Sequence, residues 1–366
     1  MRETNRTIAF TGGGTAGHVF PAFPVVERMR SAGFNVVWIG SRRGMERKLV
    51  EDSGCRYHGI PAGKFRRYFS LRNAADLFRI AAGFLAALKI FLREKPCAVF
   101  SKGGFVSVPP VAAARCLRIP ALTHESDVDP GLATRLNLRL GARALASYER
   151  TLSYLPAGAR ERAVVTGNPV RDTFFDPRQA DREEGRRIAG LGPEDKRPLI
   201  VVIGGSQGAR EVNDLIFGTL DSLLGTAAVA HQTGEGNPIV SDRDGYLSRP
   251  FFSRELPHLL AAADLAVGRS GAGSVWEFAA TGTPAVFVPL RGGATRGDQI
   301  LNAELAEGSG MAVVLPEGSG PEDLGRLIRD LFAAPERLAA MKAAAAAYPA
   351  REAADRIARV LEECAR

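Results

Sequence analysis

Short apolar runs alternate with helical patterns along the whole chain, and this alternation is the strongest constraint on its fold. The runs of the first half are TIAF, NVVWIG, CAVFS, PALTHES, ARALAS and RAVVTG. Those of the second half are PLIVVIGGS, AVAHQTG, LAVGRSG, PAVFVPL and MAVVLPE. Segments with helical spacing of apolar residues, such as 74–94 and 321–334, fall between the runs. Because strands that alternate with helices form parallel sheets covered on both faces, the chain is predicted to be an α/β protein.

The chain of 366 residues is longer than one typical domain, so we expect two domains. A charged segment at 176–198 lacks strand signals, and we place the domain junction in front of it, near Arg171. This gives an N-terminal domain over 1–170 and a C-terminal domain over 171–348. The last helical segment, 349–366, begins after a proline break, and we expect it to fold back onto the N-terminal domain.

Three glycine-rich signatures accompany the predicted strands: GGGTAGH at 12–18, SKGGFVS at 101–107 and GGSQGAR at 204–210. The first and the third each follow the first strand of their half. This repetition predicts two Rossmann-like domains whose parallel sheets face each other across a cleft. Ligands of such sheets bind beyond the carboxyl ends of the strands.

The first glycine loop reads as a strand, a tight turn and the start of a helix. Backbone N–H groups and the helix dipole at such a turn bind anions, and a phosphate is the expected guest. His18 stands at the edge of this loop, where the dipole favours a neutral imidazole that can accept a proton. His18 is therefore a candidate general base, and the alternative is a structural histidine at the helix start.

The same loop permits two other interpretations. The spacing Gly12-x-Gly14-x-x-Gly17 matches the dinucleotide fingerprint. A dehydrogenase of that class places an acidic residue after its second strand to bind the ribose, whereas this chain has Arg42 and Arg43 there. An NADP-dependent oxidoreductase is therefore a minor alternative, and a tight turn without a ligand is the other.

Polar residues follow other strands as well. Asp127 and Asp129 resemble a metal-binding DxD pair, but the proline and glycine after them favour a turn, so no dedicated metal cage is expected. Glu277 lies in the early turns of a short helix, where it either complements the dipole or accepts hydrogen bonds from a ribose diol. Asp298 and Gln299 are of the type that binds sugar hydroxyls.

The formal charge of +8 favours an anionic partner: nucleic acid, a phosphorylated substrate or a membrane surface. Residues 64–95 carry eight basic and two acidic side chains with interleaved aromatics, which predicts contact with an anionic bilayer. An ordinary amphipathic helix with a solvated face is the alternative. No nucleic-acid-binding motif accompanies the patch, so nucleic acid is not expected as a partner. The basic cluster comprises Lys64, Arg66, Arg67, Arg72, Arg79, Lys89, Arg93 and Lys95.

Membrane insertion and secretion are not expected. The longest apolar stretch, 77–92, is interrupted by Arg79 and Lys89 and is shorter than the ~20 residues of a spanning helix. The N-terminus has no signal-peptide core, and the four cysteines lack metal-ligand spacing. We therefore expect a cytoplasmic protein that binds the inner face of the plasma membrane peripherally.

Eight motifs occur in order across nearly the whole chain: GGGTAGH, GGFVS, HESD, GNPVR, GGSQGAR, HQTG, RSGAGSVWEFAATGTPAVFVP and RGDQILNA. In this set the chain resembles the peptidoglycan N-acetylglucosaminyltransferases of glycosyltransferase family 28, which have the GT-B fold. The resemblance implies transfer of N-acetylglucosamine from UDP-GlcNAc to the C4 hydroxyl of the muramyl sugar of lipid I, with inversion. It implies no required cofactor, although Mg²⁺ could enter with the substrate diphosphate. Implied partners are UDP-GlcNAc, lipid I, anionic lipid, and cell-wall and division proteins.

The resemblance also assigns roles to residues. His18 would be the catalytic base, and Asp127 would be a second candidate. The acceptor diphosphate would lie on Gly13, Gly14, Thr15, Gly17, Gly103 and Gly104. The donor would contact Thr15, Arg171, Ser206, Gln207, Phe252, Ser253, Ser274, Glu277, Asp298 and Gln299.

Within the donor set, Phe252 and Ser253 would flank the uracil, Glu277 the ribose and Gln299 the sugar hydroxyls. The chain departs from the common family pattern at Ala16, and at Asp127 and Asp298, where other members often have amides. Two alternatives stay open: a diacylglycerol glycosyltransferase of the same fold, and an inactive UDP-sugar-binding scaffold.

Overall fold

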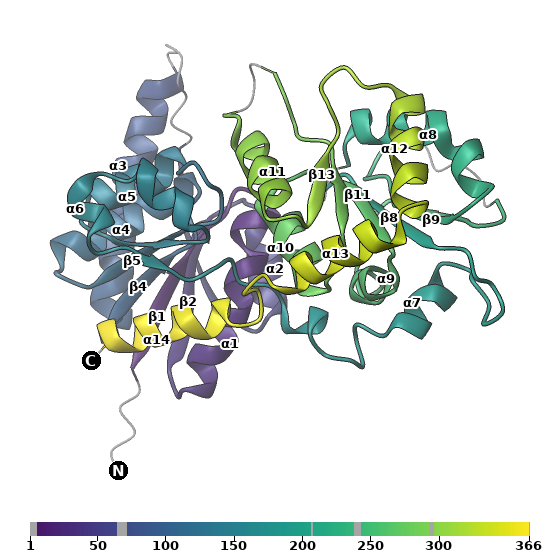
Figure 1. Cartoon of the computed structure of the whole chain (residues 1–366). Helices are drawn as coiled ribbons and strands as arrows, with labels where there is room; N and C mark the ends of the chain where they lie inside the picture. The colour runs from purple at the N-terminus through teal and green to yellow at the C-terminus, as the bar shows by residue number, and fades with distance from the viewer. Residues whose placement is uncertain (1–5, 64–71, 206–207, 238–242, 293–295, 366) are drawn as a thin grey trace. The chain divides into compact units, whose positions relative to one another are not determined.

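The computed structural model describes residues 6–63, 72–205, 208–237, 243–292 and 296–365, with residues 16 and 72–76 described by their backbone only. The chain forms two compact units (Figure 1). The N-terminal unit comprises Met1–Arg171 and Glu352–Arg366, and the C-terminal unit comprises Asp172–Arg351.

The N-terminal unit is built on a seven-stranded parallel sheet with the strand order β3-β2-β1-β4-β5-β6-β7. Its strands are β1 (Thr7–Thr11), β2 (Asn35–Ser41), β3 (Arg56–Ile60), β4 (Ala98–Ser101), β5 (Ala121–Glu125), β6 (Arg143–Ala146) and β7 (Val164–Val165). Every residue of β1 and β4 is buried, as expected for central strands covered on both faces. The edge strand β3 is more exposed, and it was absent from the expected strands because it has no continuous apolar run.

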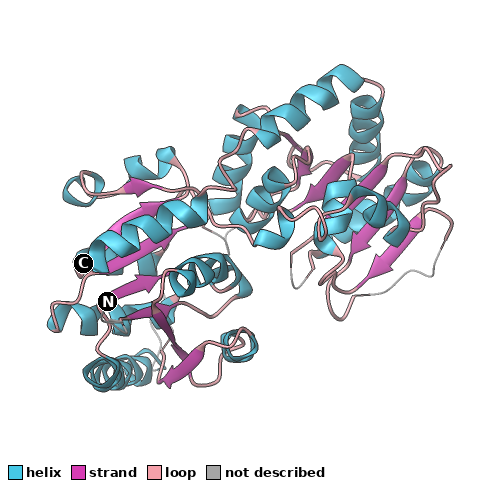
Figure 2. Ribbon diagram, turned by 90° about the horizontal axis from the view of Figure 1, so that it is seen from below, coloured by secondary structure: helices cyan, strands magenta, loops and turns pink. Residues whose placement is uncertain are grey.

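Helices cover both faces of this sheet (Figure 2). They are α1 (Phe23–Ser31), α2 (Glu46–Asp52), α3 (Arg72–Glu94), α4 (Val108–Cys116), α5 (Leu132–Arg139), α6 (Ala157–Arg160) and α14 (Ala353–Ala365). Helix α14 comes from the far end of the chain and packs with α1 through fully buried residues such as Ile357 and Leu361. Arg6 Nη1 also donates a hydrogen bond of 3.0 Å to the carbonyl of Ala365.

The C-terminal unit has a six-stranded parallel sheet with the order β10-β9-β8-β11-β12-β13. Its strands are β8 (Leu199–Ile203), β9 (Ala228–Gln232), β10 (Tyr246–Arg249), β11 (Leu265–Gly268), β12 (Ala285–Phe287) and β13 (Ala312–Val314). Its helices are α7 (Arg182–Ile188), α8 (Arg210–Leu224), α9 (Leu256–Ala262), α10 (Ala272–Ala280), α11 (Asp298–Gly308), α12 (Pro321–Phe332) and α13 (Pro335–Ala346). The prediction of an α/β fold with two parallel sheets is confirmed.

Both sheets contain a point where the strand order reverses, between β1 and β4 and between β8 and β11. In open α/β sheets, ligands bind beyond the carboxyl ends of the strands at such points. The glycine loop 12–18 follows β1, and the Gly103-Gly104 pair follows β4. The fold therefore brings two of the three glycine signatures together in the N-terminal unit.

Candidate active site

The two glycine loops of the N-terminal unit are in direct contact. A Cβ atom on Gly104 would lie 2.3 Å from the carbonyl oxygen of Gly13, and Gly104 has φ +77°. Gly14 has φ +88°, and a Cβ there would lie 2.8 Å from the Phe105 ring. Because other residues disfavour this backbone region and would clash, the loop contact itself requires glycine at these positions.

Two N–H groups of these loops donate to side chains within the unit. The fully buried Glu46 carboxylate accepts hydrogen bonds from Gly14 N (3.3 Å), Ser41 N (2.9 Å) and Ser41 Oγ (2.6 Å). The N–H of Gly103 donates to Ser101 Oγ at 3.1 Å. An acceptor diphosphate would therefore bind other donors of the loops or displace these partners. Glu46 could not be identified from the sequence, since an isolated glutamate in a helix usually faces solvent.

His18 ends a short 3-10 helix, Ala16–His18, and is half-buried. Its Nδ1 atom lies 2.9 Å from Thr15 Oγ1. A Cβ on Gly103 would lie 3.5 Å from His18 Cδ2 and 3.8 Å from Nε2, so the imidazole lies against the second glycine loop. The structure thus brings together Thr15, His18 and Gly103.

Asp127 lies in the turn after β5, and its side chain is half-buried. The turn is organised by Glu125, whose Oε1 accepts from the N–H groups of Ser126 (3.0 Å) and Asp127 (3.2 Å). Glu125 Oε2 accepts from Gly131 N (2.9 Å) and Thr134 Oγ1 (2.6 Å). Glu125 therefore holds both ends of the turn that carries Asp127.

A buried lysine also reaches this turn, and the site residues inferred from the sequence did not include it. Lys102 follows β4 directly, and only 2% of it is exposed. Its Nζ lies 2.7 Å from His124 Nδ1, 2.5 Å from Ser126 Oγ and 3.0 Å from Asn168 Oδ1. Burial lowers the pKa of Lys102 to about 7, although Glu125 and Asp127 act in the opposite direction. Its position in SKGGFVS, at the end of a buried strand, was the available signal.

Asp129 is not placed as a metal ligand, because its Oδ1 pairs with Arg135 Nη2 at 2.6 Å. Over the described ranges, no group of three or more His, Cys, Asp or Glu side chains is arranged to hold a metal ion.

The expected donor residues are spread over several elements. Arg171 is the last residue of the first segment of the N-terminal unit, and its guanidinium lies 5.4 Å from the centre of the Phe20 ring. Thr15, which was also expected to contact the donor, lies in the first glycine loop of the N-terminal unit, and the remaining described donor residues, from Phe252 to Gln299, belong to the C-terminal unit. Ser206 and Gln207 lie outside the described residues, as do Lys64, Arg66 and Arg67 of the basic cluster.

Phe252 and Ser253 follow β10, and both of their N–H groups have partners within the unit. The buried Phe252 donates to Gln232 Oε1 at 2.9 Å, and Gln232 Nε2 donates to the carbonyl of Gly205 at 3.0 Å. The exposed Ser253 donates to Glu255 Oε2 at 2.9 Å. Gln232 therefore links the ends of β8 and β9 to the segment that carries the expected uracil contact.

Helices α10 and α11 carry the remaining donor residues. Ser274 and Glu277 are half-buried on the first two turns of α10. Asp298 begins α11, and its Oδ2 lies 3.7 Å from Arg296 Nη2. Gln299 Oε1 accepts a hydrogen bond of 3.0 Å from Leu290 N, and the Gln299 carbonyl accepts one of 2.7 Å from Ser270 Oγ.

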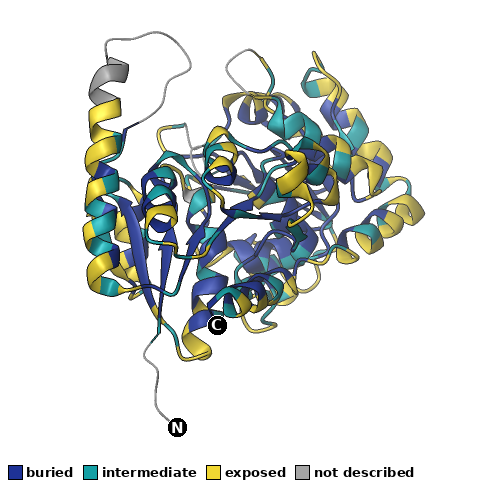
Figure 3. Ribbon diagram, turned by 90° about the vertical axis from the view of Figure 1, so that its left-hand side faces the viewer, coloured by how far each residue is buried: buried dark blue, intermediate teal, exposed yellow. Residues whose placement is uncertain are grey.

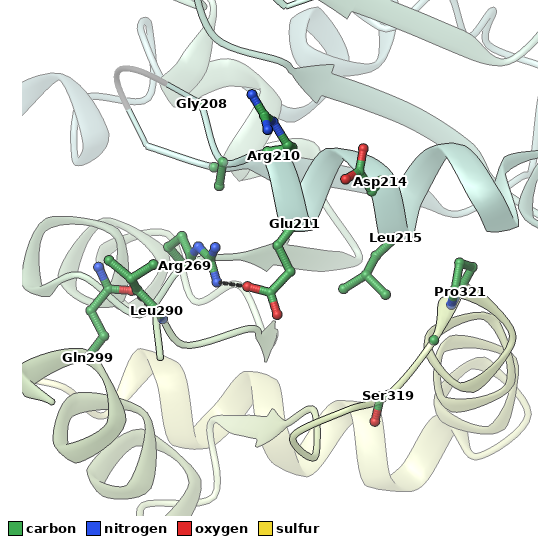
Figure 4. Close-up of a pocket in the computed structure, with 13 residues that line it drawn as sticks. Gly208, Arg210, Glu211, Asp214, Leu215, Arg269, Leu290, Gln299, Ser319 and Pro321 are labelled. Carbon is green, nitrogen blue, oxygen red and sulfur yellow. Dashed lines mark hydrogen bonds and ion pairs between the residues drawn. The ribbon is translucent and has the colours of Figure 1, made fainter. Parts of the chain in front are cut away.

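A cavity of about 700 Å³ opens at the carboxyl end of this second sheet. Gly204, the first turns of α8, Arg269, Leu290, Gln299 and the start of α12 line it. Glu211 reaches from α8 to Arg269, with 2.8 Å between Oε2 and Nη1 (Figure 4). Gln299 is the one expected donor residue in the described lining. The sequence did not indicate Glu211 and Arg269, because their pairing depends on the fold.

Comparison with known proteins places the chain in a family. Residues 8–145 match the glycosyltransferase family 28 N-terminal domain, and residues 199–357 match the family 28 C-terminal domain. The chain belongs to glycosyltransferase family 28. The N-terminal match lies within the N-terminal unit, whereas the C-terminal match runs past Arg351 into α14, which belongs to the N-terminal unit.

Curated relatives of this family 28 chain carry the same descriptive name. A Treponema denticola protein is 43% identical over 93% of each chain, and one from Shouchella clausii is 42% identical over 89% of this chain and 91% of its own. Both are named UDP-N-acetylglucosamine--N-acetylmuramyl-(pentapeptide) pyrophosphoryl-undecaprenol N-acetylglucosamine transferase. The crystal structure of Acinetobacter baumannii MurG matches with a TM-score of 0.75 and 25% identity, covering 98% of this chain and 99% of its own.

Proposed function

We propose that this chain transfers N-acetylglucosamine from UDP-GlcNAc to the C4 hydroxyl of the muramyl sugar of undecaprenyl-diphosphate-linked lipid I, forming lipid II. The observation that carries the proposal is the 43% identity, over 93% of both chains, to a relative named for this transfer. The polar groups at the carboxyl ends of both sheets support it, because each unit offers a place for one of two anionic substrates.

On the acceptor side, His18 takes the proton of the attacking hydroxyl. For Nε2 to be the base, Nδ1 must carry the proton and donate to Thr15 Oγ1, 2.9 Å away. Thr15 thereby selects the reactive tautomer. The contact of His18 with Gly103 supports a diphosphate on the adjacent loop, which would hold the acceptor sugar near the imidazole. Asp127 is the second candidate base.

On the donor side, the leaving UDP gains negative charge as the glycosidic bond breaks. The N-terminal ends of α8 and α10 offer positive dipole ends to the diphosphate, and Arg171 offers a full charge. Glu277 accepts hydrogen bonds from the ribose, and Gln299 contacts the sugar beside the cavity. Phe252 and Ser253 flank the uracil. The transfer requires no cofactor, and any Mg²⁺ would come with the substrate diphosphate.

The outer face of α3 is the proposed contact with the inner face of the plasma membrane, where the polyprenyl chain of the acceptor lies. Phe78, Leu85 and Leu92 recur every seven residues and are 78%, 63% and 63% exposed. Arg79, Lys89 and Arg93 are exposed beside them, whereas Phe91 on the other side is buried (Figure 3). No helix in the described parts of the chain is long and apolar enough to cross a membrane.

The test is UDP release from UDP-GlcNAc, measured with a lipid I analogue, with diacylglycerol and with neither. Release only with the lipid I analogue, together with a disaccharide product, supports the proposed transfer. UDP release only with diacylglycerol would instead show that the chain is a diacylglycerol glycosyltransferase. UDP-GlcNAc binding without release in any arm would indicate a scaffold.

A further inference from the structure

We propose that Lys102 is a positioning residue of the acceptor side, whose ammonium group holds the Ser126-Asp127 turn next to the Gly103-Gly104 loop. The inference rests on the proposed function, because that function assigns both segments to the acceptor site. Lys102 does not touch the substrate, because its side chain is fully enclosed.

The hydrogen-bond pattern around Lys102 matches an ammonium group with three protons on Nζ. His124 Nε2 lies 2.9 Å from the carbonyl of Gly167, so this nitrogen carries the proton and Nδ1 can only accept. Ser126 Oγ donates to Asn168 Oδ1 at 3.1 Å, so it accepts from Lys102. Asn168 Oδ1 accepts from both. Three acceptors therefore face Nζ and match the three protons of an ammonium group. A neutral amine has two protons, so the Ser126 hydroxyl would have to turn, donate to its lone pair and give up the hydrogen bond to Asn168.

The three acceptors come from two segments that are far apart in sequence. His124 belongs to β5, Ser126 to the turn after it, and Asn168 to the segment after β7. Lys102 itself lies between β4 and the glycine pair, and a Cβ on Gly12 of the first loop would lie 3.2 Å from Lys102 Cβ. One ammonium group thus links the ends of three strands, and the backbone end of the same lysine adjoins both glycine loops.

Burial and the neighbouring charges together determine whether Lys102 is protonated. Glu125 from β5 and Asp127 from the turn favour the ammonium, whereas burial opposes it. His124 stays neutral, because burial and the nearby Lys102 hold its pKa well below its usual value. On the other side, His18 lies against Gly103, and Asn168 contributes no charge.

A pH dependence follows from these neighbours. The pKa of Lys102, lowered to about 7, means that the ammonium is present below that pH and is lost above it. Acceptor use should therefore fall on the alkaline side, while donor binding to the other unit should not.

The experiment compares wild type with Lys102→Met, which keeps the volume but removes the three donors. We expect kcat/KM for the lipid I analogue to fall by about tenfold or more at pH 6.5, since more than one buried charged hydrogen bond is lost. The UDP-GlcNAc dissociation constant should not change. The alkaline fall of kcat/KM should disappear in the variant. Lys48→Met, an exposed lysine of the same unit, is the matched control.

A second variant covers the case in which Lys102→Met does not fold. Asn168→Asp keeps the acceptor but places a carboxylate 3.0 Å from Nζ. An opposite charge this close should raise the pKa of Lys102, moving the alkaline limb up by about one pH unit or more. A limb that stays unchanged in Asn168→Asp, or that persists in Lys102→Met, would overturn the inference.

Hydrogen exchange separates this inference from the proposed function. In wild type, protection of residues 124–131, corrected for intrinsic exchange, should decrease above about pH 7, the pKa of Lys102. In Lys102→Met it should already be low at pH 6.5. If wild type releases no UDP with lipid I analogue, the proposed transfer fails, whereas the exchange result still decides the role of Lys102. Protection that is equal in both proteins at every pH would contradict that role.

Discussion

At the scale of single residues, the direction of one hydrogen bond decides whether His18 can act as a base. Thr15 Oγ1 can donate to His18 Nδ1 or accept from it across the 2.9 Å between them. Only the second arrangement leaves the lone pair of Nε2 available, on the side of the ring that lies against Gly103. An acceptor hydroxyl near Gly103 would then meet the basic nitrogen.

His18→Ala should lower kcat by roughly 10²–10⁴-fold, the usual contribution of a general base. Thr15→Val should lower it by roughly 2–10-fold, because one neutral hydrogen bond is lost, and Thr15→Ser should restore it. Single-turnover kinetics with a lipid I analogue measure these effects, and calorimetry with UDP-GlcNAc should show unchanged affinity in His18→Ala. If His18→Ala keeps more than about a tenth of the wild-type rate, the loss is smaller than expected for a general base, and the histidine is structural. Asp127→Asn is then the next variant to measure.

Glu277→Ala should weaken UDP-GlcNAc binding by ~1–3 kcal/mol, the usual loss when a hydrogen bond to a charged group is removed. The residue lies on the second turn of α10, beyond the carboxyl end of β11. Isothermal calorimetry measures the change. Glu336→Ala removes an exposed glutamate from the first turn of α13 and should have no effect. Equal affinities for the two variants would remove Glu277 from the donor site.

At the scale of elements, the sequence predicted the central strands and two of the four edge strands. TIAF and PLIVVIGGS form β1 and β8, because central parallel strands are buried on both faces and read as continuous apolar runs. The edge strands β7 and β13 keep short apolar runs and were expected, whereas the edge strands β3 and β10 were missed because they contain mostly polar residues, which an edge position tolerates. No local pattern separates such strands from loops.

Some residues of the candidate site could be predicted from the sequence, and others could not. The glycine loops and the polar residues after strands could be located from the sequence, because βα connections bring strand ends to one edge of a sheet. The partners of Lys102 and Glu46 could not, because these side chains are charged and such residues are rarely buried. Their burial depends on hydrogen bonds from segments distant in sequence.

Helix α3 should bind anionic vesicles through its exposed apolar face. Phe78→Asp with Leu85→Asp places two charges where apolar side chains would enter the bilayer, so sedimentation with phosphatidylglycerol vesicles should fall sharply. Ala339→Asp with Ala343→Asp makes the same charge change on exposed positions of α13 and serves as the control. Turnover of a water-soluble acceptor analogue should be unchanged in both. Vesicle binding that survives the α3 substitutions would place the membrane contact elsewhere.

At the scale of the whole molecule, the chain completes its first unit with its last helix. Helix α14 contributes Ile357, Ala358 and Leu361 to a core that also contains Phe10 and Met29. The C-terminal unit has a separate core around β8, α8 and α12. Stability of the two units can therefore be changed separately, by a core substitution in one and by a ligand in the other.

Leu361→Ala should destabilise the N-terminal unit by ~2–5 kcal/mol, since it removes a fully buried side chain and leaves a cavity. UDP-GlcNAc at a hundred times its dissociation constant should stabilise the C-terminal unit by about 2.7 kcal/mol. Because two units need not unfold in one step, hydrogen exchange resolved by segment is the suitable measurement. In Leu361→Ala, exchange should rise in β1 and β4 and not in β8 and β11. The nucleotide sugar should protect the latter two strands in both proteins. Faster exchange of β8 in Leu361→Ala would show that the substitution also destabilises the C-terminal unit. Protection by the nucleotide sugar that is confined to β1 would show that the donor does not bind the C-terminal unit.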